Sequence, residues 1–501
     1  MFVPHRSLAA CLLPLLLAGL AATAACAARP LDAPAHDGAT RISVEHLRED
    51  FDALYAGLRA AHVDLYAHRS KTGYDALHRR MRAALDAPLT TTEARVRFQR
   101  FAAYGRVAHA RVEPPMDAWE TYLNGGGTAF PLFLRVIDGV VHVSDTIGEI
   151  EGVAPGDMLL AVDGRPVDAW LAPVRDLISA DNDHLRDTQL ETRLPLLAWL
   201  AHGSRDSFAV TVRKADGREV DAMAPARSRA EYGSLMASRV PRFELDWNAR
   251  QTRMLDGGIA YLRPGPFYDN RPDATSPWDN GAFLAFVDQA FTGFIDRDAR
   301  ALLIDLRDNP GGDNAFSDPL LAWIADKPFR FSHRFEIRVS AQTTASNRRR
   351  LQDTGADRDS LSARFDALYR GQRNGDLVQF PIDWVQPRAG RRFEGAVFVL
   401  VNRHSYSNAV SVAAIVQDFG FGTVIGEETA DLASTLGAME QFTLPRTGIE
   451  VGYPKARILR PNGDPRPRGV VPDIAIDTPI VAGSEDEVLQ RVLDIVGERR
   501  R

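Results

Sequence analysis

Two short loops, each of which follows an apolar run, carry residue types that could do chemistry. Asn309-Pro310-Gly311-Gly312 follows the apolar residues 301–306, and glycine amides that no side chain covers can approach a reacting oxygen closely. Ser407 follows the apolar residues 396–401 at the start of a predicted helix, among unpaired N–H groups and at the positive end of the helix dipole. Such a place suits a serine nucleophile whose neighbouring amide helps to form an oxyanion hole.

Both loops also have a purely structural interpretation. Pro-Gly-Gly is a common tight turn, and serine is a favoured N-cap, so Ser405 or Ser407 would cap the helix that follows. From local features alone, the turn and the cap are the simpler interpretations. The chemical interpretation therefore needs support from the rest of the chain.

The basic residues restrict which group could activate a serine. Only four of the 60 basic residues are lysines, and Lys455 is the only lysine after Ser407. No serine lies in a G-x-S-x-G motif, no lysine follows a serine at S-x-x-K spacing, and no H-E-x-x-H motif occurs. The sequence thus argues against an α/β-hydrolase elbow, a β-lactamase motif and a zinc-peptidase motif.

Helices are predicted ahead of the two loops, mostly over residues 43–112. Apolar residues recur at helical spacing from position 44 to position 58, and Ser43 before them suits an N-cap. Thr90 and Glu93 have the spacing of a capping box at the start of a second helical run. We therefore expect a helical N-terminal domain over residues 43–129, with His109 at the end of its helical part.

Residues 130–225 change character and indicate short β-strands. Asp138-Gly139 is a hairpin signal between strand-like runs, and residues 152–167 form a turn, a short apolar strand and a second turn. This segment resembles the core of a PDZ domain. Such a module binds a peptide by adding it as a strand to an open sheet edge. A small β domain that serves only as a spacer is the alternative.

From residue 226 to residue 480, apolar strands alternate with helical runs, which is typical of an α/β core. Residues 301–306 and 396–401 are predicted to be buried strands. The helix after the second of them is expected to run to about Phe419, where Gly420 provides a stop. Residues 481–501 are predicted as a C-terminal helix. The expected fold class is thus a multidomain combination of a helical region, a PDZ-like β module and an α/β core.

The N-terminus and the composition predict location and partners. Residues 8–20 are apolar but short for a membrane span, and Ala25-Cys26-Ala27 fits a cleavage site. These features predict a signal peptide over residues 1–27. Residues 28–42 are predicted to be a linker. We expect export to the periplasm or beyond, without a later membrane span; a lipid anchor at Cys26 is the alternative. The net charge of −6 comes from mixed charges without a basic stripe, so nucleic acid is not an expected partner.

The two cysteines further restrict the chemistry. Cys11 and Cys26 both lie near the N-terminus, so the mature chain keeps no pair of cysteines. An internal disulfide, a cysteine nucleophile and a cysteine zinc site are therefore not expected.

Five segments resemble, in order and spacing, a known serine peptidase family. The family includes the C-terminal processing peptidases, the tricorn core and the interphotoreceptor retinoid-binding protein repeats. The segments extend over roughly half of the chain, after the PDZ-like module. They are LIDLRDNPGG at 303–312, VLVN at 399–402, SYSNA at 405–409, IGEET at 425–429 and GVVPDI at 469–474.

The resemblance implies a core of the crotonase-like ββα type and assigns roles in the two loops. It implies that Ser407 is the nucleophile, and that the amide of Asn408 and a glycine of the Gly311-Gly312 pair form the oxyanion hole. Substrates would be peptides or partly unfolded proteins, cleaved through an acyl-enzyme without a metal or cofactor.

The family activates its serine in two ways, and the resemblance favours one of them here. Some members use a lysine some two dozen residues after the serine, a position that falls near Leu432 in this chain. Other members use a histidine in the preceding helical region, which His109 matches. A neutral imidazole is the natural base for a serine hydroxyl near neutral pH. His404 is the rival base because it lies close to Ser407 in sequence.

A third group must orient His109 and stabilise its cation. The family often has a glutamate at two positions that hold Val410 and Arg466 here. These missing glutamates favour the alternative function of a catalytically inactive protein that binds peptides or apolar ligands. The expected function is an exported serine endopeptidase. The remaining candidates for the third group are Glu427, Glu428 and Glu440.

Overall fold

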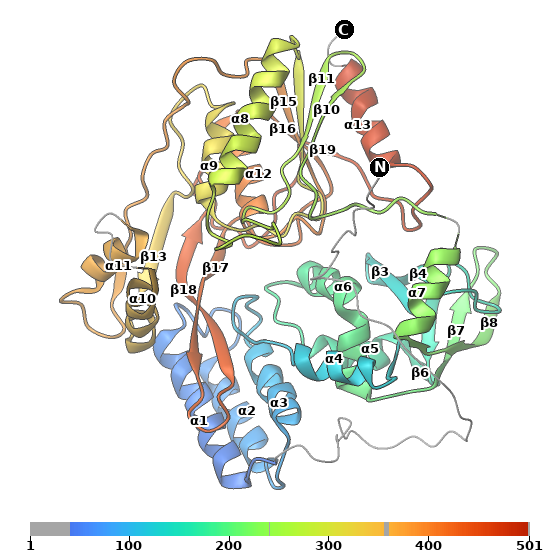
Figure 1. Ribbon diagram of the computed structural model, residues 1–501. Helices are drawn as coiled ribbons and strands as arrows, with labels where there is room; N and C mark the ends of the chain where they lie inside the picture. Colours follow the sequence, from blue (N-terminus) through green and yellow to red (C-terminus); the bar gives the residue numbers. More distant parts are fainter. Residues whose placement is uncertain (1–40, 240, 355–359, 499–501) are drawn as a thin grey trace. The chain divides into compact units, whose positions relative to one another are not determined.

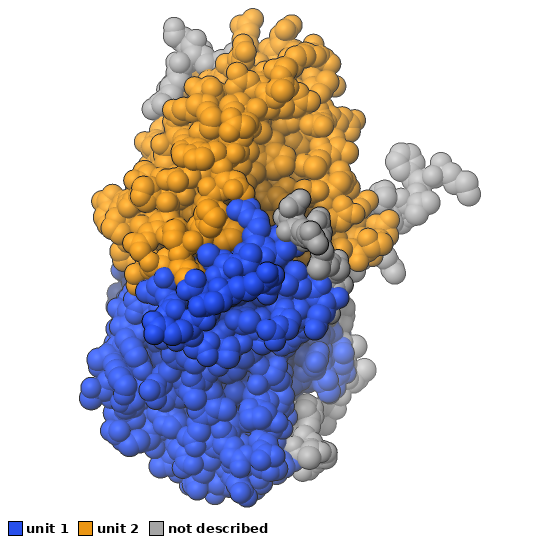
Figure 2. Space-filling view, turned by 90° about the vertical axis from the view of Figure 1, so that its left-hand side faces the viewer, with its two compact units in different colours: residues 1–241, 338–377, 436–456 blue, residues 242–337, 378–435, 457–501 orange. Residues whose placement is uncertain are grey.

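The computed structural model describes residues 41–239, 241–354 and 360–498, which fall into two compact units (Figure 2). Unit 1 comprises Met1–Pro241, Arg338–Leu377 and Leu436–Ala456, and unit 2 comprises Arg242–Ile337, Val378–Thr435 and Arg457–Arg501. The predicted signal peptide, Cys26 and nearly all of the predicted linker lie outside the described residues. Across the described ranges, no helix combines the length and the apolar character needed to cross a bilayer.

A bundle of helices opens unit 1 (Figure 1). The predicted caps are confirmed: Ser43 accepts a hydrogen bond from the His46 amide, and Thr90 and Glu93 form a capping box. The predicted apolar face of the first helix is buried, and Tyr453 from much later in the chain packs into the same core. The helices are α1 (Val44–Ala61), α2 (Lys71–Ala83) and α3 (Thr91–Ala103).

An antiparallel sheet with two helices forms the second part of unit 1, as expected for a β module. Its strand order is β3-β4-β5-β7-β8, with β6 paired to β5. Trp170 is buried in this part and packs on Phe130 and His202. The elements are β3 (Leu132–Ile137), β4 (Val140–Thr146), β5 (Met158–Val162), β6 (Arg165–Pro166), α5 (Val167–Arg175), α6 (Asp183–His202), β7 (Ser207–Arg213) and β8 (Glu219–Pro225). Its smaller neighbours are α4 (Met116–Asn124), β2 (Thr128–Ala129), β9 (Arg227–Ser228) and α7 (Arg229–Ser238).

Later segments of the chain complete unit 1. Strand β1 (Arg111–Val112) pairs antiparallel with β18 (Glu450–Leu459), so that Arg111 lies opposite Gly452. Leu444, Ile449 and Val451 of the same segment enter the core of the helical bundle. The other elements of this region are α10 (Ala341–Thr354), α11 (Leu361–Tyr369) and β17 (Thr435–Thr443).

Unit 2 is built on a sheet whose order is β10-β11-β12-β15-β16-β19, parallel from β11 onward. Alternate residues of its central strands enter two separate cores. Leu302 and Val399 belong to the core under α8, α9 and α12, whereas Leu303 and Phe398 belong to the core under α13. Figure 1 shows these helices on opposite faces of the sheet, which gives three layers.

The elements of unit 2 match the predicted α/β alternation. The predicted strands appear as β12 (Ala301–Asp305) and β15 (Ala396–Val401), and the helix between Ser407 and Gly420 appears as α12 (Asn408–Phe419). Gly420 adopts the left-handed conformation expected of a helix stop, with a φ of 72°. The remaining elements are β10 (Gln251–Leu255), β11 (Ile259–Arg263), α8 (Gly281–Asp296), α9 (Asn314–Ala322), β13 (Arg334–Arg338), β14 (Leu377–Gln379), β16 (Thr423–Gly426), β19 (Ile474–Ala475) and α13 (Glu487–Glu498).

Candidate active site

Ser407 occupies a strained turn between β15 and α12 in unit 2. Its φ of 53° and ψ of −119° lie in a region that residues with side chains rarely adopt. A strained serine at a sharp strand-to-helix turn is also the backbone shape of a nucleophile elbow, although the G-x-S-x-G motif of the α/β-hydrolases is absent here. The strain is an observation about this residue that the sequence pattern alone did not contain.

The simpler interpretation of the two serines as helix caps is wrong. Ser407 stands at the N-cap position of α12, but its hydroxyl makes no capping hydrogen bond. The hydroxyl of Ser405 donates to the carbonyl of Leu306 and accepts the amide of Asn402, so it ties β12 to β15 instead. The Ser407 hydroxyl is therefore not engaged as a cap.

The glycine loop after β12 packs directly against the Ser407 turn. A Cβ atom on Gly311 would lie 2.6 Å from the carbonyl oxygen of Tyr406 and 2.8 Å from Cβ of Ser407. Gly311 also has a φ of 84°, which favours glycine. The two loops that the sequence singled out are thus neighbours within unit 2, and glycine is required where they meet.

The amides of these loops differ in whether they are already bonded. The amide of Gly311 donates to Oδ1 of Asn309 at 2.9 Å. In the described part of the chain, by contrast, no hydrogen bond uses the amide of Gly312 or the amide of Asn408. Of the three predicted oxyanion-hole residues, Gly312 and Asn408 therefore have amides available to a ligand, and Gly311 is needed for the close approach.

Asp431 holds the Ser407 turn by hydrogen bonds to its backbone, and no sequence motif predicted this role. Its Oδ2 accepts the amide of Ser407 at 2.7 Å, and its Oδ1 accepts the amide of Leu432 at 2.9 Å. Burial raises the pKa of Asp431 to about 6, although the two amides oppose the shift. Leu432, near which the resemblance placed a dyad lysine in some members of that family, is buried beside it.

Two asparagines fix the loops to each other. The backbone carbonyl of Asn309 accepts the amide of Tyr406, and its side chain donates to the carbonyl of Gly265. The side-chain oxygen of Asn402 accepts the amides of Asp308 and His404. The predicted rival base His404 is therefore held through its backbone as a part of this scaffold.

His109 lies in unit 1, in the turn that leads into β1. Burial lowers its pKa to about 4, the charge of Arg111 adds to the shift, and a hydrogen bond with the Leu436 backbone opposes it. Its Nδ1 is buried without a hydrogen-bond partner among the described residues. His109 is thus a neutral imidazole at pH 7, with one ring nitrogen free to accept or donate a proton.

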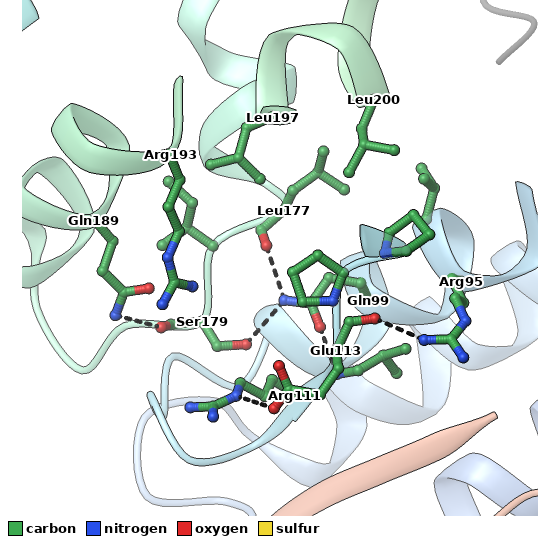
Figure 3. A pocket seen from close by; sticks show the side chains of 15 residues that line it. Arg95, Gln99, Arg111, Glu113, Leu177, Ser179, Gln189, Arg193, Leu197 and Leu200 are labelled. Atoms are coloured by element: carbon green, nitrogen blue, oxygen red, sulfur yellow. Dashed lines mark hydrogen bonds and ion pairs between the residues drawn. The ribbon is translucent and has the colours of Figure 1, made fainter. Parts of the chain in front are cut away.

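Side chains from α3 and from the segment between α5 and α6 hold the His109 turn through its backbone. Val112 donates its amide to Gln99 on α3, and the Ser179 hydroxyl donates to the carbonyl of Ala110. Gln99 also donates to the Ser179 hydroxyl, as Figure 3 shows in the pocket that these residues line. The amide of Ala108 is accepted by a carboxylate oxygen of Asp181. The turn is therefore fixed on both sides of His109.

The predicted site residues are divided between the two units. Ser407, Asn408 and the two glycines belong to unit 2, whereas His109 belongs to unit 1. Of the three predicted glutamates, Glu427 and Glu428 lie in unit 2 and Glu440 lies in unit 1. Glu427 accepts a hydrogen bond from Thr478, and Glu428 pairs with Arg468 at 3.2 Å.

Glu440 is engaged in a buried ionic cluster of unit 1. It accepts hydrogen bonds from Lys455 at 2.7 Å, from Arg350 at 2.6 Å and from Ser346. Burial opposes ionisation, but these partners outweigh it and lower the pKa of Glu440 to about 2. Burial lowers the pKa of Lys455, and Glu440 opposes this shift. Glu440, a candidate third group, and Lys455, the only lysine after Ser407, are thus paired with each other.

Comparisons with known proteins agree with the arrangement of unit 2. Residues 280–476 match the model of peptidase family S41. Mature CPAF complexed with lactacystin has a similar fold, with a TM-score of 0.59 and 17% identity over 91% of this chain and 98% of that chain. A second structure of mature CPAF gives a TM-score of 0.56 and 16% identity over 86% of this chain and 92% of that chain. No curated protein sequence matches the chain. The chain therefore carries, at residues 280–476, a domain of peptidase family S41 that includes both the Ser407 turn and the glycine loop.

Proposed function

We propose that this protein is an exported serine endopeptidase that cleaves peptides or partly unfolded proteins. The observation that carries the proposal is the strained Ser407, at a φ of 53°, beside two amides without intramolecular partners in the described chain. An ordinary helix cap needs neither the strain nor free amides. A nucleophile elbow with an oxyanion hole needs both.

In the proposed mechanism, Oγ of Ser407 attacks the peptide carbonyl while its proton passes to His109. The amides of Asn408 and Gly312 bind the oxyanion of the tetrahedral intermediate. His109 then donates the proton to the leaving amine, which leaves an acyl-enzyme on Ser407. Water hydrolyses this ester by the same steps, with His109 again as the base. Asp431 acts as a positioning residue because it holds the amide of Ser407.

The low pKa of His109 keeps its imidazole in the neutral form that this cycle needs, although it also makes the imidazole a weaker base. A base must be neutral to accept the serine proton, and His109 is neutral at every pH well above 4. The proposed proton transfer requires Oγ of Ser407 and a ring nitrogen of His109 to lie within hydrogen-bond reach. Glu428 and Glu427 are the proposed candidates to orient His109, because Glu440 is already paired with Lys455.

We further propose that residues 130–225 act as a PDZ-like module that engages extended peptide. The antiparallel sheet β3-β4-β5-β7-β8 supports this proposal, because an edge strand of such a sheet can accept an added strand. The predicted signal peptide supports export, and the crotonase-like ββα core remains our expectation for the catalytic domain.

A fluorophosphonate probe tests the proposal directly. The wild-type protein should be labelled and should hydrolyse a fluorogenic peptide, and Ser407→Ala should do neither. Ser411→Ala, on the first turns of the same α12 helix, is the matched control and should keep both activities. Equal labelling of Ser407→Ala would reject Ser407 as the nucleophile. Saturable peptide binding without labelling of the wild-type protein would instead establish the non-catalytic alternative.

A further inference from the structure

A pocket of about 390 Å³ in unit 1 has no part in the proposed reaction. It lies among α2, α3 and the segment that joins α5 to α6. Asp176 is the only acidic residue among those that line it. Its arginines are Arg69, Arg80, Arg100, Arg106, Arg175 and Arg186.

Three of these arginines have carboxylate partners, of which one is shared and two are exposed. Arg106 and Arg186 contact the same carboxylate oxygen of Asp183, at 2.6 Å and 3.0 Å, and the side chain of Asp183 is 65% exposed. Arg175 contacts Asp168 and Asp187. Exposed ion pairs are screened by water and hold charges only weakly. The exposed Asp183 and Asp168 therefore leave much of the positive potential of the pocket in place, whereas Asp187, whose side chain is 17% exposed, is shielded from water together with Arg175.

The other three arginines have no ion pair among the described residues. Arg69 donates to the carbonyl of Tyr104, and the side chains of Arg80 and Arg100 make no hydrogen bond to the described chain. When Asp176 and the three partner aspartates are all counted, the six guanidinium groups still exceed the carboxylates by two charges. The pocket thus concentrates positive charge that the described chain does not neutralise.

Buried N–H groups without hydrogen-bond partners also indicate that the pocket binds an anion. Nε of Arg100 and Nε of Arg186 are buried without a hydrogen-bond partner among the described residues. Burial also lowers the pKa of Arg100, although Asp176 opposes the shift, so this cation is desolvated without full compensation. The Nε edge of a guanidinium group is the edge that binds carboxylate or phosphate in a bidentate manner.

We propose that this pocket binds a phosphate group, either as a free phosphorylated molecule or as the headgroup of a phospholipid. A phosphate monoester carries roughly two negative charges at neutral pH, which matches the surplus of two. A pocket of this volume is within the size range of small-molecule sites, roughly 300–1,000 Å³. Leu77, Met81 and Ile178 give part of the wall an apolar character that suits the remainder of such a ligand.

Isothermal titration of inorganic pyrophosphate into the full chain tests the proposal. We expect one saturable site whose affinity falls as salt is added. Removal of one guanidinium group that bonds the anion should weaken binding by roughly tenfold or more, so Arg80→Gln and Arg100→Gln should each show this loss. Arg79→Gln and Arg97→Gln lie on the same two helices outside the pocket and should bind as the wild type does.

Vesicles distinguish the two sources of phosphate. A lipid headgroup is identified if the protein floats with vesicles that contain phosphatidic acid, does not float with phosphatidylcholine vesicles, and floats less well as the Arg80→Gln variant. A free ligand is identified if the protein binds pyrophosphate but does not float with either kind of vesicle. Arg80 is exposed, so its substitution leaves the fold intact and keeps the test decisive. The proposal is overturned if neither probe binds, if the control variants lose as much affinity, or if a peptide carboxylate binds as tightly as pyrophosphate.

Discussion

The variant Asp431→Asn tests how the nucleophile turn is held. Both oxygens of Asp431 accept buried amides, from Ser407 at 2.7 Å and from Leu432 at 2.9 Å. Asparagine has the same shape but one acceptor oxygen, so its NH₂ group would face one of these N–H donors. An unsatisfied buried donor costs about 1–3 kcal/mol, which is as large as the strain of about 1–3 kcal/mol that a residue like Ser407 stores. We therefore expect the turn to relax and kcat to fall by at least about tenfold, with little change in KM.

Asp50 provides a matched control for this experiment. It is a buried aspartate of α1 that accepts the amides of Arg446 at 2.9 Å and Thr447 at 2.7 Å, far in sequence from Ser407. Asp50→Asn should lose a similar free energy of unfolding in urea, about 1–3 kcal/mol, and keep its kcat per folded molecule. Peptide hydrolysis and fluorophosphonate titration of active sites measure the two effects separately. An Asp431→Asn protein that loses stability but keeps kcat would refute the positioning role.

Three further expectations concern pH, the glycine loop and the buried ionic cluster. The rate of peptide hydrolysis should fall in two steps as the pH is lowered, first near 6 as Asp431 is protonated and then near 4 as His109 is protonated. Asp431→Asn should show only the lower step. A single step near 6.5 would contradict these pKa values. Gly311→Ala would place a Cβ 2.6 Å from a backbone oxygen, so probe labelling should fall by about 100-fold or more while circular dichroism stays unchanged. Glu440→Gln leaves the buried Lys455 without its carboxylate partner, so the free energy of unfolding in urea should fall by about 3–5 kcal/mol. A loss of kcat per folded molecule would instead support Glu440 as the third catalytic group.

The sequence predicted well those parts of the fold that follow from local periodicity and end signals. Alternation and apolar runs located β12 and β15, and Gly420 marked the end of α12. Ser43 and the Thr90–Glu93 pair cap helices as their spacing predicted. These features depend on residues close together in the chain, for which helical and strand geometry fixes the contacts.

The parts that sequence reasoning missed depend on contacts between distant loops. Asp431 reaches Ser407 only because β16 lies beside β15, and no spacing rule marks such an acid. The side chain of Asn309 decides which glycine amide is free, a choice that Pro-Gly-Gly alone leaves open. Glu440 was one of three candidates for the third group, and no spacing rule indicated its pairing with Lys455 on a neighbouring strand. In each case the role of the residue depends on a hydrogen bond that sequence periodicity does not predict.

The makeup of unit 1 has a consequence for the order in which a growing chain can fold. The core of its first three helices includes Leu444, Ile449, Val451 and Tyr453. Until synthesis has passed these residues, the apolar face of α1 lacks part of its cover, and β1 next to His109 lacks its partner β18. A nascent chain therefore cannot complete the core beside the His109 turn until Tyr453 has been synthesised. The proposed peptidase activity would thus be withheld from chains that end before these residues.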